Sequence, residues 1–233
     1  MFREKLAASG IEKTSVIVHI PYLPNLSGPA SEFYTKSVET LAGEMERCNA
    51  LGIPYLVIHL GSHMGKGTKS GVDQLVNAIN SARDKSKTKS EPAVLLENNA
   101  GTNNSVGGNF EELRLILDQL GSKGYGVCLD TCHLFASGYD LRTREKVNET
   151  IEHFDKVVGI RQLQAIHLND SKGTLKSNLD RHEHIGLGLI GSEGLAAFIN
   201  HKEIKSLPII METPIDEKRE NGQNLQLVLG FVK

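Results

Sequence analysis

Six short runs of aliphatic residues recur along the chain and predict buried β-strands. They cover residues 16–20, 55–60, 93–98, 125–131, 164–170 and 207–214. Continuous Val, Ile and Leu runs are typical of parallel strands, because both faces of such a sheet are covered. The segments between them carry apolar residues at the i, i+3, i+4 spacing of amphipathic helices, most clearly over 38–48, 75–82 and 113–120. The pattern predicts one parallel α/β domain over residues 1–233.

Each strand run closes on a side chain that can bind a metal ion: His19, His59, Glu97, Asp130, His167 and Glu212. A buried charge or imidazole at such a position is costly unless it is paired or metal-bound. Ligands of an open parallel sheet gather at one switch point, whereas all strand ends of a barrel face a common mouth. The strand ends therefore favour a TIM-type (β/α)8 barrel, and the chain supplies six of its eight strands.

Three further candidate ligands lie in loops beyond the predicted strands: His133, Asp180 and His182. The nine residues comprise five histidines and four carboxylates, a mixture that suits Zn, Mn, Fe or Ni better than Mg or Ca. At about three protein ligands per catalytic ion, nine would hold three ions. Such a cluster clamps a phosphoryl group and generates hydroxide at neutral pH, so phosphoester hydrolysis is the leading reaction class.

The same residues also allow a simpler interpretation. A single histidine at a strand end is often a satisfied core residue, and Asp180 and His182 lie in a polar loop where charges are merely solvated. From the pattern alone the role of these two residues stays open. Four histidines do not end a strand run, and we interpret them as structural: His63, His153, His184 and His201.

Composition narrows the class of protein. No run reaches the roughly 18 apolar residues that span a bilayer, and the first residues lack a secretory signal, which indicates a soluble intracellular protein. The three cysteines, Cys48, Cys128 and Cys132, form no CxxC pair and are interpreted as free core thiols. The formal net charge of −2 argues mildly against a nucleic-acid binder.

Four longer motifs identify a family resemblance: ENNAG from residue 97, CLDTCH from 128, HLNDSK from 167 and DRHEHIGLG from 180. With them the chain resembles the endonuclease IV family of apurinic/apyrimidinic endonucleases, and is most similar to its fungal branch. The resemblance implies a barrel of the xylose-isomerase-like kind and a hydrolase of double-stranded DNA. We expect a monomer, because a site that grips a long duplex leaves little reason for a partner subunit. Cleavage would occur 5′ to abasic sites, and 3′-end trimming is a related activity. A eukaryotic member would act in the nucleus and the mitochondrion.

The resemblance also assigns the nine ligands to three Zn²⁺ ions. His19 and His59 would hold one ion with Glu97, which would bridge to a second ion and orient the attacking hydroxide. The second ion would be completed by Asp130, His167 and Glu212, and the third held by His133, Asp180 and His182. Tyr22 and Leu23 match family positions that press into DNA at the lesion. Three divalent ions would also make the net charge positive at the site.

One departure from the family concerns the N-terminal end. Family members carry about two further βα units before the segment that starts here at 18–26, so the resemblance implies a barrel lacking its N-terminal part. Two alternatives stay open. Loss of the N-terminal part would leave an inactive remnant that only binds metal or DNA. Metal ligands at strand ends are also compatible with a metal-dependent sugar isomerase or epimerase on the same barrel.

Overall fold

The structure is a computed structural model that describes residues 1–86, 92–121 and 123–233. The chain divides into two compact units. The first comprises Met1–Glu97, Asn104–Gly107 and Glu112–Val127, and the second comprises Asn98–Asn103, Gly108–Glu111 and Cys128–Lys233.

The first unit is built on adjacent parallel strands. β1 (Ile17–His19) pairs with β2 (Tyr55–Ile58), and β2 pairs with β3 (Ala93–Glu97). In register, Ile17 lies opposite Tyr55, and Tyr55 opposite Ala93. This in-phase pairing brings the carboxyl ends of the three strands to one edge.

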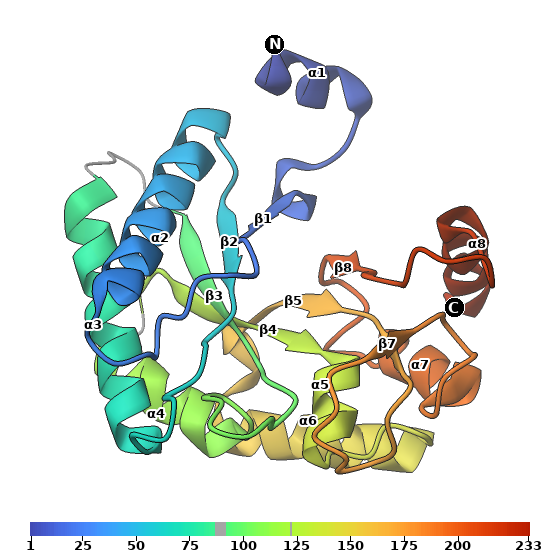
Figure 1. Cartoon of the computed structure of the whole chain (residues 1–233). Helices are drawn as coiled ribbons and strands as arrows, with labels where there is room; N and C mark the ends of the chain where they lie inside the picture. Colours follow the sequence, from blue (N-terminus) through green and yellow to red (C-terminus); the bar gives the residue numbers. More distant parts are fainter. Residues whose placement is uncertain (87–91, 122) are drawn as a thin grey trace. The chain divides into compact units, whose positions relative to one another are not determined.

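Three helices follow the strands of this unit, as the apolar spacing predicts: α2 (Glu32–Leu51), α3 (Thr68–Ser86) and α4 (Phe110–Leu120), most of which belongs to this unit. Helix α1 (Phe2–Ser9) and the 3₁₀ turn η1 (Lys13–Ser15) precede β1. The Ser31 side chain caps the start of α2 by accepting a hydrogen bond from Tyr34 N, and Gly52 ends the helix with a φ of 74°. Helices α2 and α3 pack side by side (Figure 1), and the periodic residues Leu41, Met45, Leu75 and Ile79 are fully buried.

Strand β4 (Tyr125–Asp130) belongs to both units, since it follows β3 in the first unit and precedes β5 (Leu163–His167) and β8 (Ile209–Ile210) in the second. The second unit also contains the antiparallel pair β6 (Asp170–Ser171) and β7 (His182–Glu183). Its helices are α5 (Thr131–Ser137), α6 (Arg144–Val157), η2 (Ile160–Gln162), α7 (Gly191–Ile199) and α8 (Asn221–Phe231).

The predicted strand positions are confirmed, with shorter ends. The last strand, expected over 207–214, covers only Ile209–Ile210, because Pro208 and Pro214 cannot donate to a strand ladder. The strand expected over 164–170 ends at His167, and Asp170 begins the unpredicted pairing of β6 with β7. The three cysteines are free and buried, as expected.

Asp170 organises the loop between β7 and α7. Its carboxylate is fully buried and accepts hydrogen bonds of 2.9–3.3 Å from five backbone N–H groups, those of Ser171, Gly186, Gly188, Ile190 and Gly191. Gly188 must be glycine here, because a Cβ at this position would lie 2.5 Å from Asp170 Oδ1. One buried side chain thus fixes the path of the segment that follows β7.

We expect Asp170→Ala to lower the free energy of unfolding by about 3 kcal/mol or more, because it leaves several buried N–H donors without an acceptor. Chemical denaturation measures this change. Asp73→Ala is the control, since Asp73 forms an exposed pair with Lys69 and its loss should cost about 0.5 kcal/mol or less. Equal effects of the two substitutions would contradict the organising role of Asp170.

Candidate functional site

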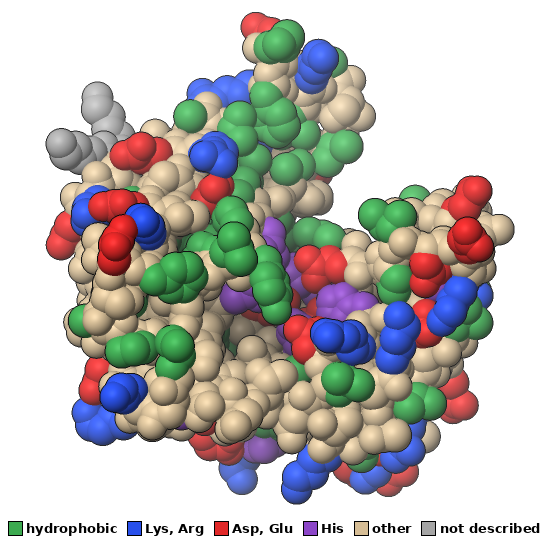
Figure 2. Space-filling model, in the orientation of Figure 1, with side chains coloured by type: hydrophobic (Ala, Val, Ile, Leu, Met, Phe, Trp, Pro, Cys, Tyr) green, Lys and Arg blue, Asp and Glu red, His purple; other side chains and the backbone are tan. Residues whose placement is uncertain are grey.

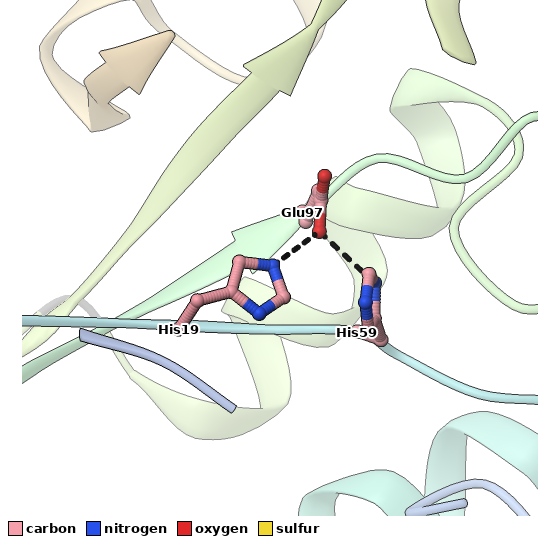
Figure 3. A group of neighbouring side chains, drawn as sticks. All are labelled: His19, His59 and Glu97. Carbon is pink, nitrogen blue, oxygen red and sulfur yellow. Dashed lines mark hydrogen bonds and ion pairs between the residues drawn. The ribbon is translucent and has the colours of Figure 1, made fainter. Parts of the chain in front are cut away.

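The first group of predicted ligands lies within the first unit, at the carboxyl edge of its parallel strands. His19 ends β1, His59 directly follows β2, and Glu97 ends β3. Glu97 Oε2 lies 3.2 Å from His19 Nε2 and 3.0 Å from His59 Nδ1, and the two imidazole rings have centroids 4.6 Å apart (Figure 3). The structure therefore brings these three predicted residues together around one point.

A backbone carbonyl sets the orientation of the His19 ring. His19 Nδ1 lies 2.7 Å from the carbonyl oxygen of Ile20, and because a carbonyl only accepts, Nδ1 carries the hydrogen. In a neutral imidazole, Nε2 then turns a lone pair toward the Glu97 carboxylate, which is also an acceptor. Only a proton or a metal ion can hold two acceptors so close, and ligands about 2 Å from a tetrahedral ion lie about 3.3 Å apart.

The second group, His133, Asp180 and His182, lies in the second unit and repeats this arrangement. His133 Nδ1 donates to the carbonyl of Asn98 at 2.9 Å, and its Nε2 lies 3.2 Å from Asp180 Oδ1. His182 Nδ1 donates to the carbonyl of Glu212 at 3.0 Å. Its Nε2 lies 3.7 Å from both Asp130 Oδ2 and Asp180 Oδ1.

The Nε2 atom of His182 gives the clearest indication of a cation. Within the described part of the chain, this nitrogen is buried and has no hydrogen-bond partner. A buried acceptor that faces two carboxylates without a hydrogen bond is unfavourable unless a positive charge lies between them. The donor set of two imidazoles and one carboxylate fits a transition-metal ion.

The third group, Asp130, His167 and Glu212, also lies in the second unit. Asp130 ends β4, His167 ends β5, and Glu212 follows β8 by two residues. His167 Nδ1 is 3.2 Å from Glu212 Oε2, and the three residues offer ligand atoms within 4.8 Å of one another. Asp130 also caps α5 by accepting a hydrogen bond from His133 N at 2.8 Å.

Two asparagines that the sequence reasoning missed hold these ligands in place. The Asn169 side chain donates to Asp130 Oδ2 at 2.6 Å and accepts from Glu212 N at 2.8 Å. The Asn98 side chain accepts a hydrogen bond from Asp130 N at 2.7 Å, and the backbone carbonyl of Asn98 orients the His133 ring. Their signal was present in the motifs ENNAG and HLNDSK, where each asparagine lies within two residues of a predicted ligand.

Cys132 also lies close to a group of ligands, together with Asp130 and His182. Burial, together with the charge of Asp130, raises the pKa of the Cys132 thiol to about 12. Without a bound ion the side chain is therefore a neutral thiol at neutral pH.

The remaining residues singled out in the sequence lie either on the surface or in the core. Tyr22 and Leu23 are 81% and 77% exposed, and the Tyr22 ring packs edge-on against His59 with centroids 5.8 Å apart. His184 is fully buried in a hydrogen-bond network of its own, whereas His153 pairs with Glu111 on the surface. Among the described residues, neither histidine belongs to a group of candidate metal ligands.

Strands that alternate with helices and end on ligand-type side chains define a parallel α/β protein with candidate metal sites. The chain belongs to the family of xylose isomerase-like TIM barrels, whose family model matches residues 1–231. The barrel class predicted from the sequence is thereby confirmed.

Among its relatives, the "Probable endonuclease 4" of Nitrosopumilus maritimus is 51% identical over 231 residues, which cover 99% of this chain and 82% of the relative. The protein of the same name from Cenarchaeum symbiosum is 49% identical over 97% of this chain and 80% of its own length. The crystal structure of endonuclease IV from Thermus thermophilus matches with a TM-score of 0.86 at 34% identity, over 99% of this chain and 79% of that one. These relatives make the chain a nuclease of the hydrolase class.

The comparisons bear on two expectations from the sequence, the fungal-like branch and the sugar isomerase or epimerase alternative. The relatives named above are archaeal and bacterial, so they give no support to a fungal-like branch. A D-tagatose 3-epimerase-like protein also matches, with a TM-score of 0.72 at 20% identity over 98% of this chain and 80% of that one, but this likeness shows a shared fold alone. Among the described residues, no helix combines the length and apolar character needed to cross a membrane.

We expect divalent ions to stabilise the folded chain, because ligands that bind only the folded state raise its stability by about 2.7 kcal/mol at 100 times their Kd. Thermal unfolding of chelator-treated protein, with and without added Co²⁺, measures the effect. His182→Ala should weaken Co²⁺ binding in calorimetry, while His153→Ala, which removes an exposed imidazole, should not. A melting temperature that does not change when Co²⁺ is added would contradict the metal interpretation.

Proposed function

We propose that the chain is a zinc-dependent DNA-repair endonuclease that hydrolyses the phosphodiester 5′ to abasic sites in double-stranded DNA. One observation carries this proposal. In His19, His133 and His182, one ring nitrogen donates to a backbone carbonyl while the other faces a carboxylate. Such histidines are oriented for metal binding. Trimming of blocked 3′ ends is a further activity of the same site.

The donor set supports zinc and a count of three ions. We divide the nine ligands into three groups of three whose ligand atoms lie within 4.8 Å of one another: His19, His59 and Glu97; Asp130, His167 and Glu212; and His133, Asp180 and His182. Three protein ligands per ion leave a position open for water or substrate, as in catalytic zinc sites. When bound, zinc ions supply the positive charge that lowers the pKa of water and stabilises a departing oxygen.

Glu97 is the residue to which we assign the catalytic role. Its side chain is almost completely buried, and one oxygen is shared between His19 and His59. A carboxylate held in this way orients the attacking water and takes up its proton. The water oxygen bonds to phosphorus, the bond from phosphorus to the 3′ oxygen breaks, and that oxygen leaves as a 3′-hydroxyl after it receives the proton that Glu97 took from the water.

Tyr22 and Leu23 are the residues to which we assign contact with the lesion. Both are large, apolar and highly exposed, and Tyr22 touches the ligand His59. Exposed apolar side chains can wedge between bases, and unstacking costs least where a base is already missing. The visible surface mixes Lys and Arg with Asp and Glu (Figure 2), so bound ions would supply much of the attraction for phosphate.

The remaining features of the proposal rest on the sequence. They are a monomeric state, a single barrel domain over residues 1–233, and an intracellular location, which in a eukaryote would be the nucleus and the mitochondrion. The family pattern also implies that Glu97 would help to hold a second ion. Size-exclusion chromatography with light scattering tests the monomer directly.

We expect zinc-loaded protein to nick an abasic duplex on the 5′ side and Glu97→Gln to lower this rate at least about 100-fold, because an amide is a poor base. A gel assay with end-labelled duplex measures both the rate and the cleavage position. Glu111→Gln, an exposed glutamate paired with His153, is the matched control and should cleave normally.

Two results of this assay would refute the proposal. Near-normal cleavage by Glu97→Gln would remove the role of that carboxylate. No cleavage by folded, zinc-loaded protein would favour a remnant that only binds metal or DNA.

We expect Leu23→Ala to weaken binding of abasic duplex about tenfold, since wedging and stacking contacts contribute about 1–3 kcal/mol each. Fluorescence anisotropy with an abasic and an intact duplex measures the change. Phe33→Ala, which removes another exposed apolar side chain of the first unit, is the control. An equal loss for both variants would argue against a specific role of Leu23.

A further inference from the structure

A buried polar network lies beside the ligands of the second unit. His184 and Asn224 are both 0% exposed. Asn224 Nδ2 lies 2.9 Å from His184 Nδ1, and His184 Nε2 lies 2.8 Å from Asp216 Oδ1. None of these three residues belongs to the nine candidate ligands.

The direction of each hydrogen bond in this network is fixed. Asn224 Oδ1 accepts from Ile185 N at 3.2 Å, so the amide nitrogen of Asn224 must be the group that faces His184. The amide nitrogen donates, and His184 Nδ1 is therefore the acceptor. His184 then carries its hydrogen on Nε2 and donates it to Asp216, and this hydrogen bond lowers the pKa of the Asp216 carboxyl.

The network joins two chain segments that each carry a candidate ligand. His184 lies two residues after His182, and Asp216 lies four residues after Glu212. Asn224 Nδ2 also approaches Thr213 Oγ1, the residue directly after Glu212, at 3.3 Å. The two segments meet again where His182 Nδ1 donates to the carbonyl of Glu212. Asn224 therefore ties helix α8 to both ligand-bearing segments at once.

We propose that Asn224 is a positioning residue that, through His184 and Asp216, holds His182 and Glu212 in their metal-binding geometry. This inference rests on the proposed metal-dependent function. Its chemical basis is that Asn224 is both a donor to His184 and an acceptor from Ile185, so an apolar side chain of similar size would lose both contacts. Residues that orient ligands in this way commonly change metal affinity about 10–100-fold when replaced.

The chain offers a matched control for a merely structural effect. Asn200 also holds helix α8, because its Nδ2 donates to the carbonyl of Phe231 at 2.7 Å and its Oδ1 accepts from Lys233 N at 2.8 Å. These contacts of Asn200 lie at the other end of α8 and include neither ligand-bearing segment. Asn200→Leu thus loosens the same helix but leaves the hydrogen bonds of Asn224 with His184 and Ile185 in place.

Calorimetric titration of the full chain with Co²⁺ tests the proposal. We expect wild-type protein and Asn200→Leu to bind Co²⁺ alike, and Asn224→Leu to bind at least one ion about 10-fold or more weakly. Asp216→Ala, at the solvent end of the network, should weaken the same ion and avoids the risk that a core substitution prevents folding. Circular dichroism and thermal unfolding verify that each variant is folded.

The outcomes distinguish a failure of the positioning role of Asn224 from a failure of the proposed function. If wild-type protein takes up no Co²⁺, the metal-dependent function fails, and the role of Asn224 with it. If wild-type protein binds Co²⁺ but the folded variants Asn224→Leu and Asp216→Ala match Asn200→Leu within about twofold, only the positioning role is overturned.

Discussion

The candidate site depends on one arrangement, in which one ring nitrogen of a histidine faces a carboxylate while the other donates a hydrogen bond to a backbone carbonyl. For His19 and His133 the facing atoms are 3.2 Å apart, and for His182 they are 3.7 Å apart. Without a cation or a proton, each such pair costs free energy, because two acceptors repel each other, most strongly where a partner is buried, as Glu97 and Asp130 are. The chain therefore carries a local cost at these positions that binding of a positive ion would remove.

The fold tolerates this cost because the elements that carry the ligands are held by other contacts. In the first unit, aliphatic strands and the buried faces of α2 and α3 fix the strand ends where His19, His59 and Glu97 emerge. In the second unit, where β6, β7 and β8 are only two residues long, polar contacts do much of this work. Asn169 joins Asp130 to Glu212, and Asp170 fixes the loop after β7.

This difference explains how much of the molecule could be predicted from the sequence. The aliphatic runs fixed the strand positions, and ligand-type residues at their ends identified Glu97 and its partners, because strand ends lie together wherever parallel strands pair in phase. The short β6–β7 pair could not be predicted, because strands of two residues carry no hydrophobic pattern. The path of the loop after β7 depends on hydrogen bonds to a single carboxylate, that of Asp170. The orientation of His182 was equally out of reach, because it is set by the carbonyl of Glu212, 30 residues later.

The same contacts decide which ligand groups depend on one another. His19, His59 and Glu97 all belong to the first unit, and the adjacent strands of that unit hold them. In the second unit the two groups share contacts: Asp130 caps the helix that carries His133, and Glu212 orients the ring of His182. A disturbance at one group of the second unit must therefore reach the other through these hydrogen bonds, since neighbouring contacts of this kind are energetically coupled. In the second unit, connected hydrogen bonds thus hold the six ligands of both groups. In the first unit, the adjacent strands hold the ligands.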